Sequence, residues 1–250
     1  MKRLLGSLIL GCALVSASSS SAAISSCNTS DYALQCARVP NAVPAQTAGG
    51  GARPADTAGP PRWRIYKYGI DFAWGSVSAH TAWNMGARFG ASYLSTDASK
   101  NWTWAMINSY HARGMGTVAV WETTATRALS GYAAGRSDAR SALSEERALG
   151  IPTSRPVYFA VDFNETSGQA PVVGWYFEGA DSVMGASRVG AYGGYLAVAS
   201  LFDAGRIGYG WECSLWSDGY WDPRAQIQQY AYGSVYDWDA AMSADYGQTL

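Results

Sequence analysis

The stretch that decides the fold reads Arg155-Pro-Val-Tyr-Phe-Ala-Val-Asp-Phe-Asn-Glu165. Within it, residues 157–161 are all apolar and mostly β-branched or aromatic, which is typical of a strand buried on both faces. Strands of this kind belong to parallel sheets. Asp162 follows at the carboxyl end of the strand, where α/β barrels carry their chemistry, so it is the first candidate site residue. The alternative is that Asp162 only caps the next turn or helix.

Around this strand, the chain from Trp63 onward alternates strand-like and helix-like segments with short connections. Strands are predicted at residues 64–72, 89–94, 116–121, 157–161, 188–192, 209–215, 226–230 and 234–238. Helices are predicted at residues 78–87, 102–113, 131–149, 171–184 and 197–202. About eight strands, nearly all separated by helices or long turns, predict a single α/β domain, a (β/α)8 TIM-like barrel. At roughly 190 residues the barrel would be small, with short or missing last helices.

The composition is that of an ordinary globular chain: 48% of the 250 residues are hydrophobic, 15% are charged, and the formal net charge is -1. Phosphate binding needs clustered Lys and Arg, which the sequence lacks, so we expect no nucleic-acid partner. The 11 Trp and 16 Tyr are the unusual feature. Aromatic rings serve as platforms for sugar rings, so this content favours a carbohydrate ligand.

The first residues have the layout of a secretory signal: Lys2 and Arg3, an apolar run over 4–15, and a Ser-rich stretch that ends in Ala22-Ala23. We therefore expect a signal peptide at 1–23 and a secreted, extracellular protein that can associate with the cell wall. A membrane anchor is the alternative, but it needs an uninterrupted apolar span of about 20 residues, which is missing. We expect no membrane span after cleavage.

Within residues 24–61, the stretch from Ala37 to Pro61 is rich in Ala, Gly, Pro and Thr and has almost no periodicity. This composition predicts an N-terminal segment with a disordered linker, followed by the folded domain at 62–250. Within the signal, Ile9-Leu10-Gly11-Cys12 resembles a lipoprotein cleavage box, which leaves lipidation of Cys12 open.

Three of the 4 Cys follow the predicted signal. In an oxidising compartment Cys27 and Cys36 can close a small loop, which leaves Cys213 as the odd thiol. A nucleophilic Cys213 is one interpretation. A buried small hydrophobic residue is the favoured one, because neither His80 nor His111 lies in a motif that would make it a base. Both histidines lie on predicted surface helices, with a site role for His111 as the alternative. No His, Asp or Glu cluster has metal-ligand spacing, so we expect no metal and no cofactor.

Acidic residues gather at the predicted carboxyl ends of strands, although the chain has only 19 Asp and Glu. In a barrel these ends converge. Facing carboxyls raise each other's pKa through repulsion and burial, which suits a general acid near neutral pH. The glycosidic bond is the bond most commonly cut by two carboxyls, one donating a proton and one stabilising or attacking the sugar. The residues at these ends are Asp71, Glu122, Asp162, Asn164, Asp237 and Asp239.

Four motifs carry a resemblance to a known family through their order and spacing. They are Tyr68-Gly69-Ile70-Asp71-Phe72, Tyr158-Phe159-Ala160-Val161-Asp162-Phe163, Arg188-Val189-Gly190-Ala191-Tyr192-Gly193, and Gln228-Gln229-Tyr230 followed by Asp237-Trp238-Asp239. The chain resembles the actinobacterial glycoside-hydrolase-like domain of unknown function, which is itself similar to the Chalaropsis-type lysozymes. The resemblance covers about residues 68–242, and it implies a (β/α) barrel, secretion and a role at the cell envelope.

The resemblance also implies site residues. In the similar lysozymes the first strand ends in an Asp that Asp71 matches, and the last strand ends in an acid that Asp237 or Asp239 matches. Their fourth strand ends in Asp-x-Glu, but here Asp162-x-Asn164 has an amide, which cannot donate a proton in the same way.

Two other acids are candidates for the missing proton donor. Glu165 is adjacent, but the alternation of a strand places it on the opposite face. Glu122, from the neighbouring strand, is the better substitute.

We therefore predict a protein that acts on or binds a cell-wall glycan of the peptidoglycan type. As a hydrolase, it would use Asp162 as the essential carboxylate and Glu122 as the proton donor, while Asp71 and Asp239 tune both and hold the sugar. Aromatic rings near the strand ends can stack on sugars. The predicted binding residues are Trp74, Trp121, Tyr192, Asn164, Asp237 and Gln229. The alternative is a catalytically degenerate barrel that serves as a carbohydrate-binding or protein-interaction module.

Overall fold

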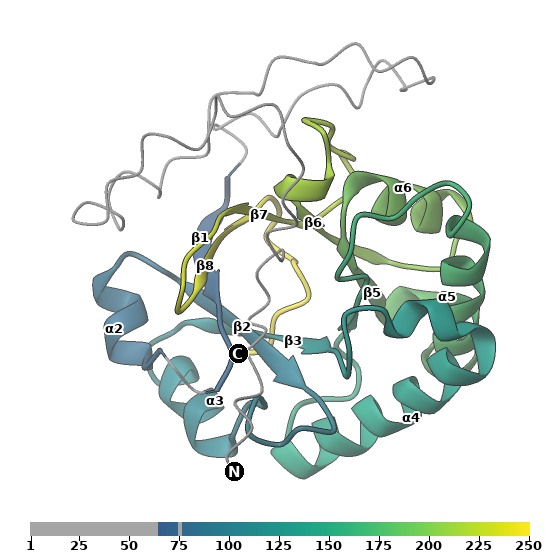
Figure 1. Cartoon of the computed structure of the whole chain (residues 1–250). Helices are drawn as coiled ribbons and strands as arrows, with labels where there is room; N and C mark the ends of the chain where they lie inside the picture. The colour runs from purple at the N-terminus through teal and green to yellow at the C-terminus, as the bar shows by residue number, and fades with distance from the viewer. Residues whose placement is uncertain (1–64, 75–76) are drawn as a thin grey trace, which may run out of the picture.

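Eight strands pair in chain order and close into a barrel, which Figure 1 shows with the barrel interior at its centre. The structure is a computed structural model and describes residues 65–74 and 77–250. The expected signal at 1–23, the linker at 24–61 and the expected pair Cys27 and Cys36 lie outside the described residues. The strands are β1 (Lys67–Asp71), β2 (Phe89–Leu94), β3 (Gly116–Trp121), β4 (Val157–Ala160), β5 (Val189–Gly193), β6 (Tyr209–Cys213), β7 (Ile227–Ala231) and β8 (Asp237–Ala241).

Helices cover the outside of the barrel from β1 to β6 (Figure 1). They are α2 (Ala79–Asn84), α3 (Trp104–His111), α4 (Gly131–Leu149), α5 (Ala170–Met184) and α6 (Tyr195–Asp203), with 3-10 turns η2 (Arg127–Ser130), η3 (Ala186–Arg188) and η4 (Ser214–Trp216). After α6 the described chain has no further α-helix, so the prediction of a small barrel with missing last helices is confirmed. Among the described residues, no helix has both the length and the apolar character needed to cross a membrane.

The last strand departs from the expected all-parallel barrel. β1 to β7 run parallel, but β8 is antiparallel to both β7 and β1. The reason lies in the short connection, because only residues 232–236 separate β7 from β8. A parallel crossover needs about a dozen residues or more, whereas antiparallel neighbours can be joined by a short turn. The strand predicted at 234–238 therefore begins at Asp237 and points the other way.

Alternating residues of each strand divide the core into two layers. The side chains inside the barrel include Phe89, Tyr158 and Trp211, and those between the strands and their outer cover include Phe159 and Trp238. All five are fully buried. Removing such a side chain from water contributes about 1.5–3 kcal/mol or more, so both layers stabilise the barrel.

Glycines make room for the aromatic rings inside the barrel. A Cβ added to Gly69 would lie 2.3 Å from the ring of Phe89, and one added to Gly190 would lie 2.6 Å from the ring of Tyr158. Neighbouring strands therefore pair a residue without a side chain with a residue that has a large one. Packing thus explains why glycine occupies these positions in the motifs of β1 and β5.

The longest helices, α4 and α5, pack against each other at very short distance. A Cβ on Gly135 would lie 1.8 Å from the carbonyl oxygen of Tyr176, so the helix backbones leave no space for a side chain there. An ion pair fixes the same region: the Arg127 guanidinium donates two hydrogen bonds of 2.8 Å to Asp138. The Tyr176 hydroxyl donates a third to Asp138, at 2.9 Å. This helix pair supports the outer faces of the central strands.

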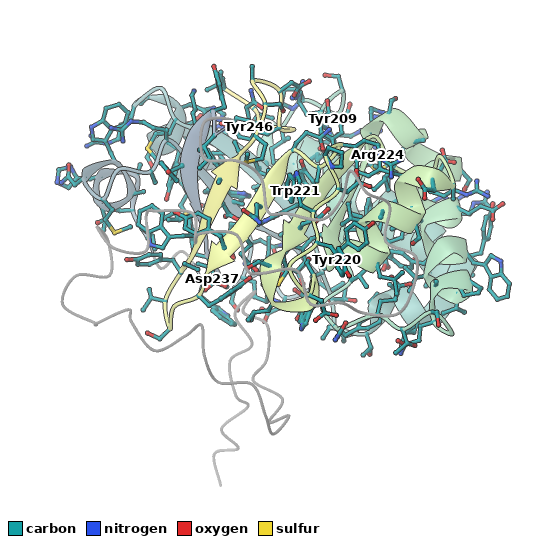
Figure 2. All side chains as sticks on the ribbon, turned by 90° about the horizontal axis from the view of Figure 1, so that it is seen from above. Tyr209, Tyr220, Trp221, Arg224, Asp237 and Tyr246 are labelled. Atoms are coloured by element: carbon teal, nitrogen blue, oxygen red, sulfur yellow. The ribbon has the colours of Figure 1, made fainter. Side chains whose placement is uncertain are left out.

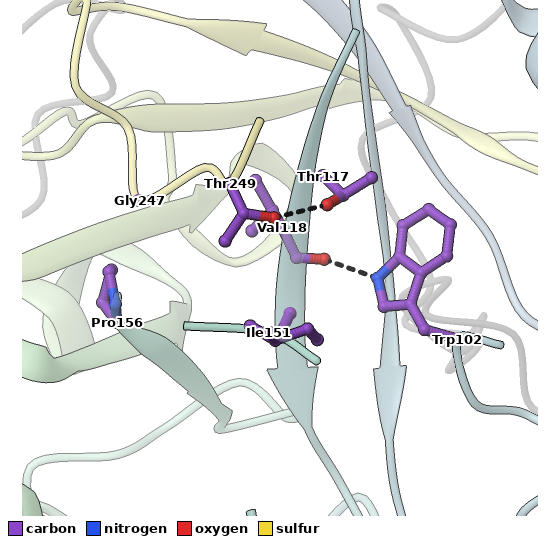
Figure 3. A pocket seen from close by; sticks show the side chains of 8 residues that line it. Trp102, Thr117, Val118, Ile151, Pro156, Gly247 and Thr249 are labelled. Carbon is purple, nitrogen blue, oxygen red and sulfur yellow. Dashed lines mark hydrogen bonds between the residues drawn. The ribbon is translucent and has the colours of Figure 1, made fainter. Parts of the chain in front are cut away.

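The C-terminal tail closes the end of the barrel where the parallel strands begin, which we call the base. Thr249 pairs with Thr117 at the start of β3, both through the backbone and through their hydroxyls at 2.7 Å. The tail leaves a cavity of about 10 Å³ beside Trp102, enough for about one water molecule (Figure 3). His111 is half-buried here, with its Nε2 2.9 Å from the Thr117 hydroxyl, so it belongs to the base and not to the exposed surface or the predicted site.

Candidate functional site

Five carboxyl groups face one another at the end of the barrel where the parallel strands β1 to β7 end, which we call the mouth. Asp71 is the last residue of β1, and Glu122 directly follows β3. Asp162 lies just beyond Ala160, the last residue of β4. Asp237 and Asp239 lie in β8, whose reversed direction brings its first residues to the same end and pairs Asp237 with Asp71. Figure 2 shows Asp237 at the opposite end of the barrel from Tyr246, which lies at the base. All five carboxyl residues are at most 7% exposed.

Gln229 on β7 connects two of these carboxyls. Its Nε2 donates to Asp71 Oδ2 at 2.7 Å and to Asp237 Oδ2 at 3.2 Å. The Tyr192 hydroxyl donates to the amide oxygen of Gln229 at 2.8 Å, which fixes the amide with its N–H groups toward the acids. The backbone N–H of Gly233 donates to Asp237 Oδ1 at 2.7 Å. Gln229 and Tyr192, both predicted to bind sugar, are thus buried residues that order the carboxyls.

Asp71 and Asp239 are both fully buried, and each affects the pKa of the other. Trp211 Nε1 donates to Asp239 Oδ1 at 2.9 Å, but Asp71 Oδ1 and Asp239 Oδ2 have no donor among the described residues. Burial raises the pKa of Asp71 well above its usual range, and the charge of Asp239 raises it further. Burial and the charge of Asp237 raise the pKa of Asp239.

Glu122 and Asp162 have different electrostatic surroundings. The Lys100 ammonium lies 3.7 Å from Glu122 Oε1 and 3.9 Å from the centre of the Tyr93 ring. Burial raises the pKa of Glu122, while the charge of Lys100 opposes this shift. Burial and then the charge of Glu122 raise the pKa of Asp162 to about 8. At neutral pH the Asp162 carboxyl is therefore protonated, and the cation favours an ionised Glu122.

Other predicted site residues lie in different places. Trp74 is exposed at the mouth end of β1, with a left-handed φ of 55°. Trp121 is 1% exposed and packs in the layer outside the strands, because its position in β3 alternates away from Glu122. It therefore offers no face to a sugar in this structure. Asn164 is exposed.

Glu165 contrasts with its neighbour Asn164. It is buried, and neither of its carboxylate oxygens has a partner among the described residues. Burial raises its pKa to about 7. The strand alternation used to place it does not apply, because β4 ends at Ala160 and the chain turns before residue 165.

Cys213 corrects an expectation. It was predicted to be an odd thiol, with a nucleophilic role as one interpretation, but its sulfur is disulfide-bonded. It is fully buried in the inner layer, and it is the last residue of β6, paired with Gln229 of β7. The prediction of a free thiol is therefore wrong, and a thiol nucleophile at this position is excluded while the disulfide is intact.

Sequence reasoning missed three residues of the mouth: Lys100, Tyr93 and Trp211. Lys100 lies in the loop after β2, and loops after barrel strands commonly carry site residues, so this loop was a signal that could have been used. Within the described residues, no group of three or more His, Cys, Asp and Glu is arranged to hold a metal ion.

The barrel and its carboxyl-lined mouth define a glycoside-hydrolase-like protein. The chain belongs to the Rv2525c-like, glycoside hydrolase-like domain family, whose model matches residues 80–245. The resemblance expected from the sequence is thus confirmed. The matched segment begins at residue 80, so it does not include Asp71. No curated protein matches the chain.

Solved structures support this placement. The Mycobacterium tuberculosis Tat-secreted protein Rv2525c, solved with L-tartrate, is similar at 25% identity and a TM-score of 0.67, over 73% of this chain and 98% of that chain. An uncharacterised protein of B. stearothermophilus has 16% identity and a TM-score of 0.51, over 70% and 95%. The autolysin LytC of Streptococcus pneumoniae, solved with a synthetic peptidoglycan ligand, has 12% identity and a TM-score of 0.50, over 70% and 46%. The last two likenesses concern the fold alone.

Proposed function

We propose that this protein is a secreted glycoside hydrolase that acts on a cell-wall glycan of the peptidoglycan type. One observation carries the proposal: burial raises the pKa of two neighbouring carboxyls at the mouth, but only Glu122 forms an ion pair with Lys100. Asp162 has a pKa of about 8, whereas Glu122 lies beside the Lys100 ammonium. A pair of acids whose surroundings separate their pKa values is the usual arrangement of a proton donor and a carboxylate.

We assign Asp162 and Glu122 the reverse of the roles expected from the sequence. Asp162 holds a proton at neutral pH and would donate it to the leaving oxygen. Glu122, favoured as the anion by Lys100, would stabilise the sugar centre or activate the attacking water. Asp71 and Asp239, whose pKa values burial raises, would hold the sugar and maintain the charge balance of the mouth. This assignment explains how a chain with Asn164 in place of the lysozyme donor would retain an acid.

Similarity to solved structures supports the proposed substrate class, and the sequence of residues 1–23 supports the proposed location outside the cell. Rv2525c of Mycobacterium tuberculosis is Tat-secreted, and LytC was solved with a peptidoglycan ligand. The expected signal at 1–23 would place the present protein outside the cell, where cell-wall glycan is the abundant polysaccharide.

The test compares the mature wild type with Asp162→Asn and Glu122→Gln on purified peptidoglycan, measuring released reducing ends and bound protein. Loss of a general acid costs roughly 10² to 10⁴ in rate, so each variant should lose turnover by at least that order while binding persists. Asp97→Asn is the control, because this exposed carboxyl lies in the same loop as Lys100. Wild-type turnover should also fall above about pH 8, where Asp162 loses its proton.

The second candidate is a glycan-binding module without turnover. Asn164 favours it, because an exposed amide stands where the similar lysozymes have an acid. Equal background release by all four proteins, with binding retained, would establish this alternative and contradict the hydrolase.

A further inference from the structure

We propose that the 3-10 turn η4, which follows β6, carries a sugar-binding platform: the ring of Trp216 stacks on a pyranose ring of the glycan and holds it beside Asp162. The ligand class is a pyranose that presents an apolar C–H face, because such a face packs on an aromatic ring. The platform belongs to the mouth, so the identity of its ligand rests on the proposed function. No residue of η4 was predicted to bind sugar from the sequence.

The two sides of the mouth differ in chemistry. The five carboxyls lie on β1, on β8 and just beyond the ends of β3 and β4. The other side, from β5 to β7, has aromatic rings, with Tyr192 in β5, Trp216 in η4 and Tyr232 just after β7. Trp216 and Tyr232 are half-buried and pack against the inner layer of the barrel. A glycan hydrolase needs both kinds of surface, since the acids act on the bond and the rings hold the sugar.

Tyr192 connects Trp216 to the proposed proton donor. The Tyr192 and Trp216 rings lie 6.4 Å apart between their centres, at an angle of 70°. Burial and then the charge of Asp162 raise the pKa of Tyr192 well above its usual range, so Asp162 lies within electrostatic reach of this ring. A sugar stacked on Trp216 would therefore be close to Asp162.

Hydrogen bonds from β7 fix the position of η4. The Tyr232 hydroxyl accepts from the backbone N–H of Leu215 at 3.1 Å and lies 2.8 Å from the Ser214 hydroxyl. It donates to the carbonyl oxygen of Gln229 at 3.0 Å, so the turn is tied to the residue whose amide orders Asp71 and Asp237. The platform and the carboxyls thus share one rigid support.

The start of α6 fixes the other side of the turn. The Ser217 hydroxyl donates to the carbonyl oxygen of Cys213 at 2.8 Å and accepts from the backbone N–H of Tyr195 at 3.0 Å. A Cβ on Gly194 would lie 2.5 Å from the Trp216 carbonyl oxygen, so the two backbones are in direct contact. A ring that is already held in place loses little conformational entropy when it binds a ligand.

A second pair of rings extends the platform away from the carboxyls. Tyr195 and Tyr220 are half-buried, and their ring centres lie 5.3 Å apart at an angle of 36°. Tyr220 follows Trp216 by one turn, closed by its N–H donating to the Ser217 carbonyl oxygen at 2.7 Å. Figure 2 shows Tyr220 at the same end of the barrel as Asp237. The next sugar of a chain would therefore pass over this pair, on the β5 and β6 side of the mouth.

Calorimetric titration with soluble glycan fragments of purified peptidoglycan tests the platform. The variants are Trp216→Ala and Trp216→Phe, and Trp175→Ala is the control because this ring is 56% exposed on the outer helix α5. Trp216→Ala should weaken affinity at least about tenfold, since truncating a Trp at the centre of a binding site commonly costs this much. Trp216→Phe keeps an aromatic face and should recover part of the loss, while Trp175→Ala should bind like wild type. Wild-type affinity in Trp216→Ala would overturn the platform.

Footprinting of the wild type tests the same contact without any change to the fold. Hydroxyl radicals oxidise accessible indole rings, and mass spectrometry measures the rate at Trp216 and at Trp175. The bound glycan fragments should slow oxidation of Trp216 and leave Trp175 unchanged. Unchanged oxidation of Trp216 in the bound protein would overturn the platform even if Trp216→Ala binds weakly.

Turnover, measured on the same proteins, separates the platform from the hydrolase. Weak binding by Trp216→Ala, together with no turnover by wild type, would keep the platform and contradict the hydrolase. Turnover by wild type with the same KM in Trp216→Ala would keep the hydrolase and overturn the platform. A wild type that binds no glycan fragment would overturn both.

Discussion

The two ends of the barrel interior are built from the same strands but by opposite chemistry. At the base, Phe89 and Tyr246 pack ring to ring at 4.7 Å, and the Tyr158 hydroxyl donates to the carbonyl oxygen of Tyr246 at 2.9 Å. At the mouth, Asp71 and Asp162 are equally buried but each has a carboxyl oxygen without a donor among the described residues. The base stabilises the fold, whereas the mouth costs stability.

This difference indicates where function resides. Burying an apolar ring contributes favourable free energy, while burying a carboxyl costs free energy unless it is neutralised or fully hydrogen-bonded. Aromatic rings close the barrel at the base without the free-energy cost of burying a carboxyl. Packing alone therefore gives no reason to bury five carboxyls at the mouth. Strongly shifted pKa values of this kind cluster at functional sites, so the mouth is the candidate and the base is the support.

The largest effect should come from breaking the base. Phe89→Ala removes a fully buried ring that fills the space left by Gly69 and packs on Tyr246. Large-to-small substitutions of this kind cost about 3–5 kcal/mol, and chemical denaturation should show this loss in the free energy of unfolding. Trp104→Ala, at a position 65% exposed, is the control and should stay within about 0.5 kcal/mol. A similar loss of unfolding free energy in both variants would contradict the claim that the buried rings at the base stabilise the fold more than exposed rings do.

The next effect is the pH dependence that the mouth imposes on stability. A carboxyl in the unfolded chain titrates near pH 4, while Asp162 in the folded chain titrates at about 8. Between these values only the folded state holds the proton, so the contribution of Asp162 to stability is fully present below about pH 4 and is lost as the pH rises to about 8. Each such group contributes a slope of about 1.4 kcal/mol per pH unit.

Asp162→Asn should remove its share of this slope and leave the protein more stable than wild type at pH 8. The measurement is urea unfolding at pH 5, 6, 7 and 8, with Asp218→Asn as the exposed control. Equal slopes in all three proteins would show that the Asp162 carboxyl is hydrated and ionised at neutral pH, contrary to its burial at the mouth.

The sequence predicted the barrel well because its strands carry a strong local signal. The continuous apolar run before Asp162 and the acid at its end were sufficient to place β4 and its site residue. The direction of β8 was missed, because alternation along a strand is the same in both directions and only the short connection at 232–236 distinguishes them. The reversal nevertheless brought Asp237 and Asp239 to the expected end.

The site was predictable at strand ends and less so in loops. Asp71, Glu122, Asp162 and Asp239 converge as expected, since strand geometry fixes their places. Lys100 was missed because no periodic pattern constrains a loop, although its ammonium lies 3.7 Å from the Glu122 carboxylate. The state of Cys213 was missed for a different reason: pairing among three cysteines depends on distances in the fold, which spacing along the chain does not give.

The smallest effect compares one hydroxyl at each end. Tyr192→Phe removes the donor to Gln229, and Tyr158→Phe removes the donor to the Tyr246 carbonyl oxygen. Each variant loses one buried hydrogen bond, so each should lose about 1 kcal/mol of unfolding free energy. The variants should differ in pH dependence, because the Gln229 amide lowers the pKa of Asp71 and is no longer held in place without Tyr192. The pKa of Asp71 then rises further, and in Tyr192→Phe the fall in stability should extend to higher pH than in wild type, whereas Tyr158→Phe should keep the wild-type profile. Identical profiles in the two variants would show that Gln229 is held by its packing alone, and that the mouth does not depend on Tyr192 for its charge state.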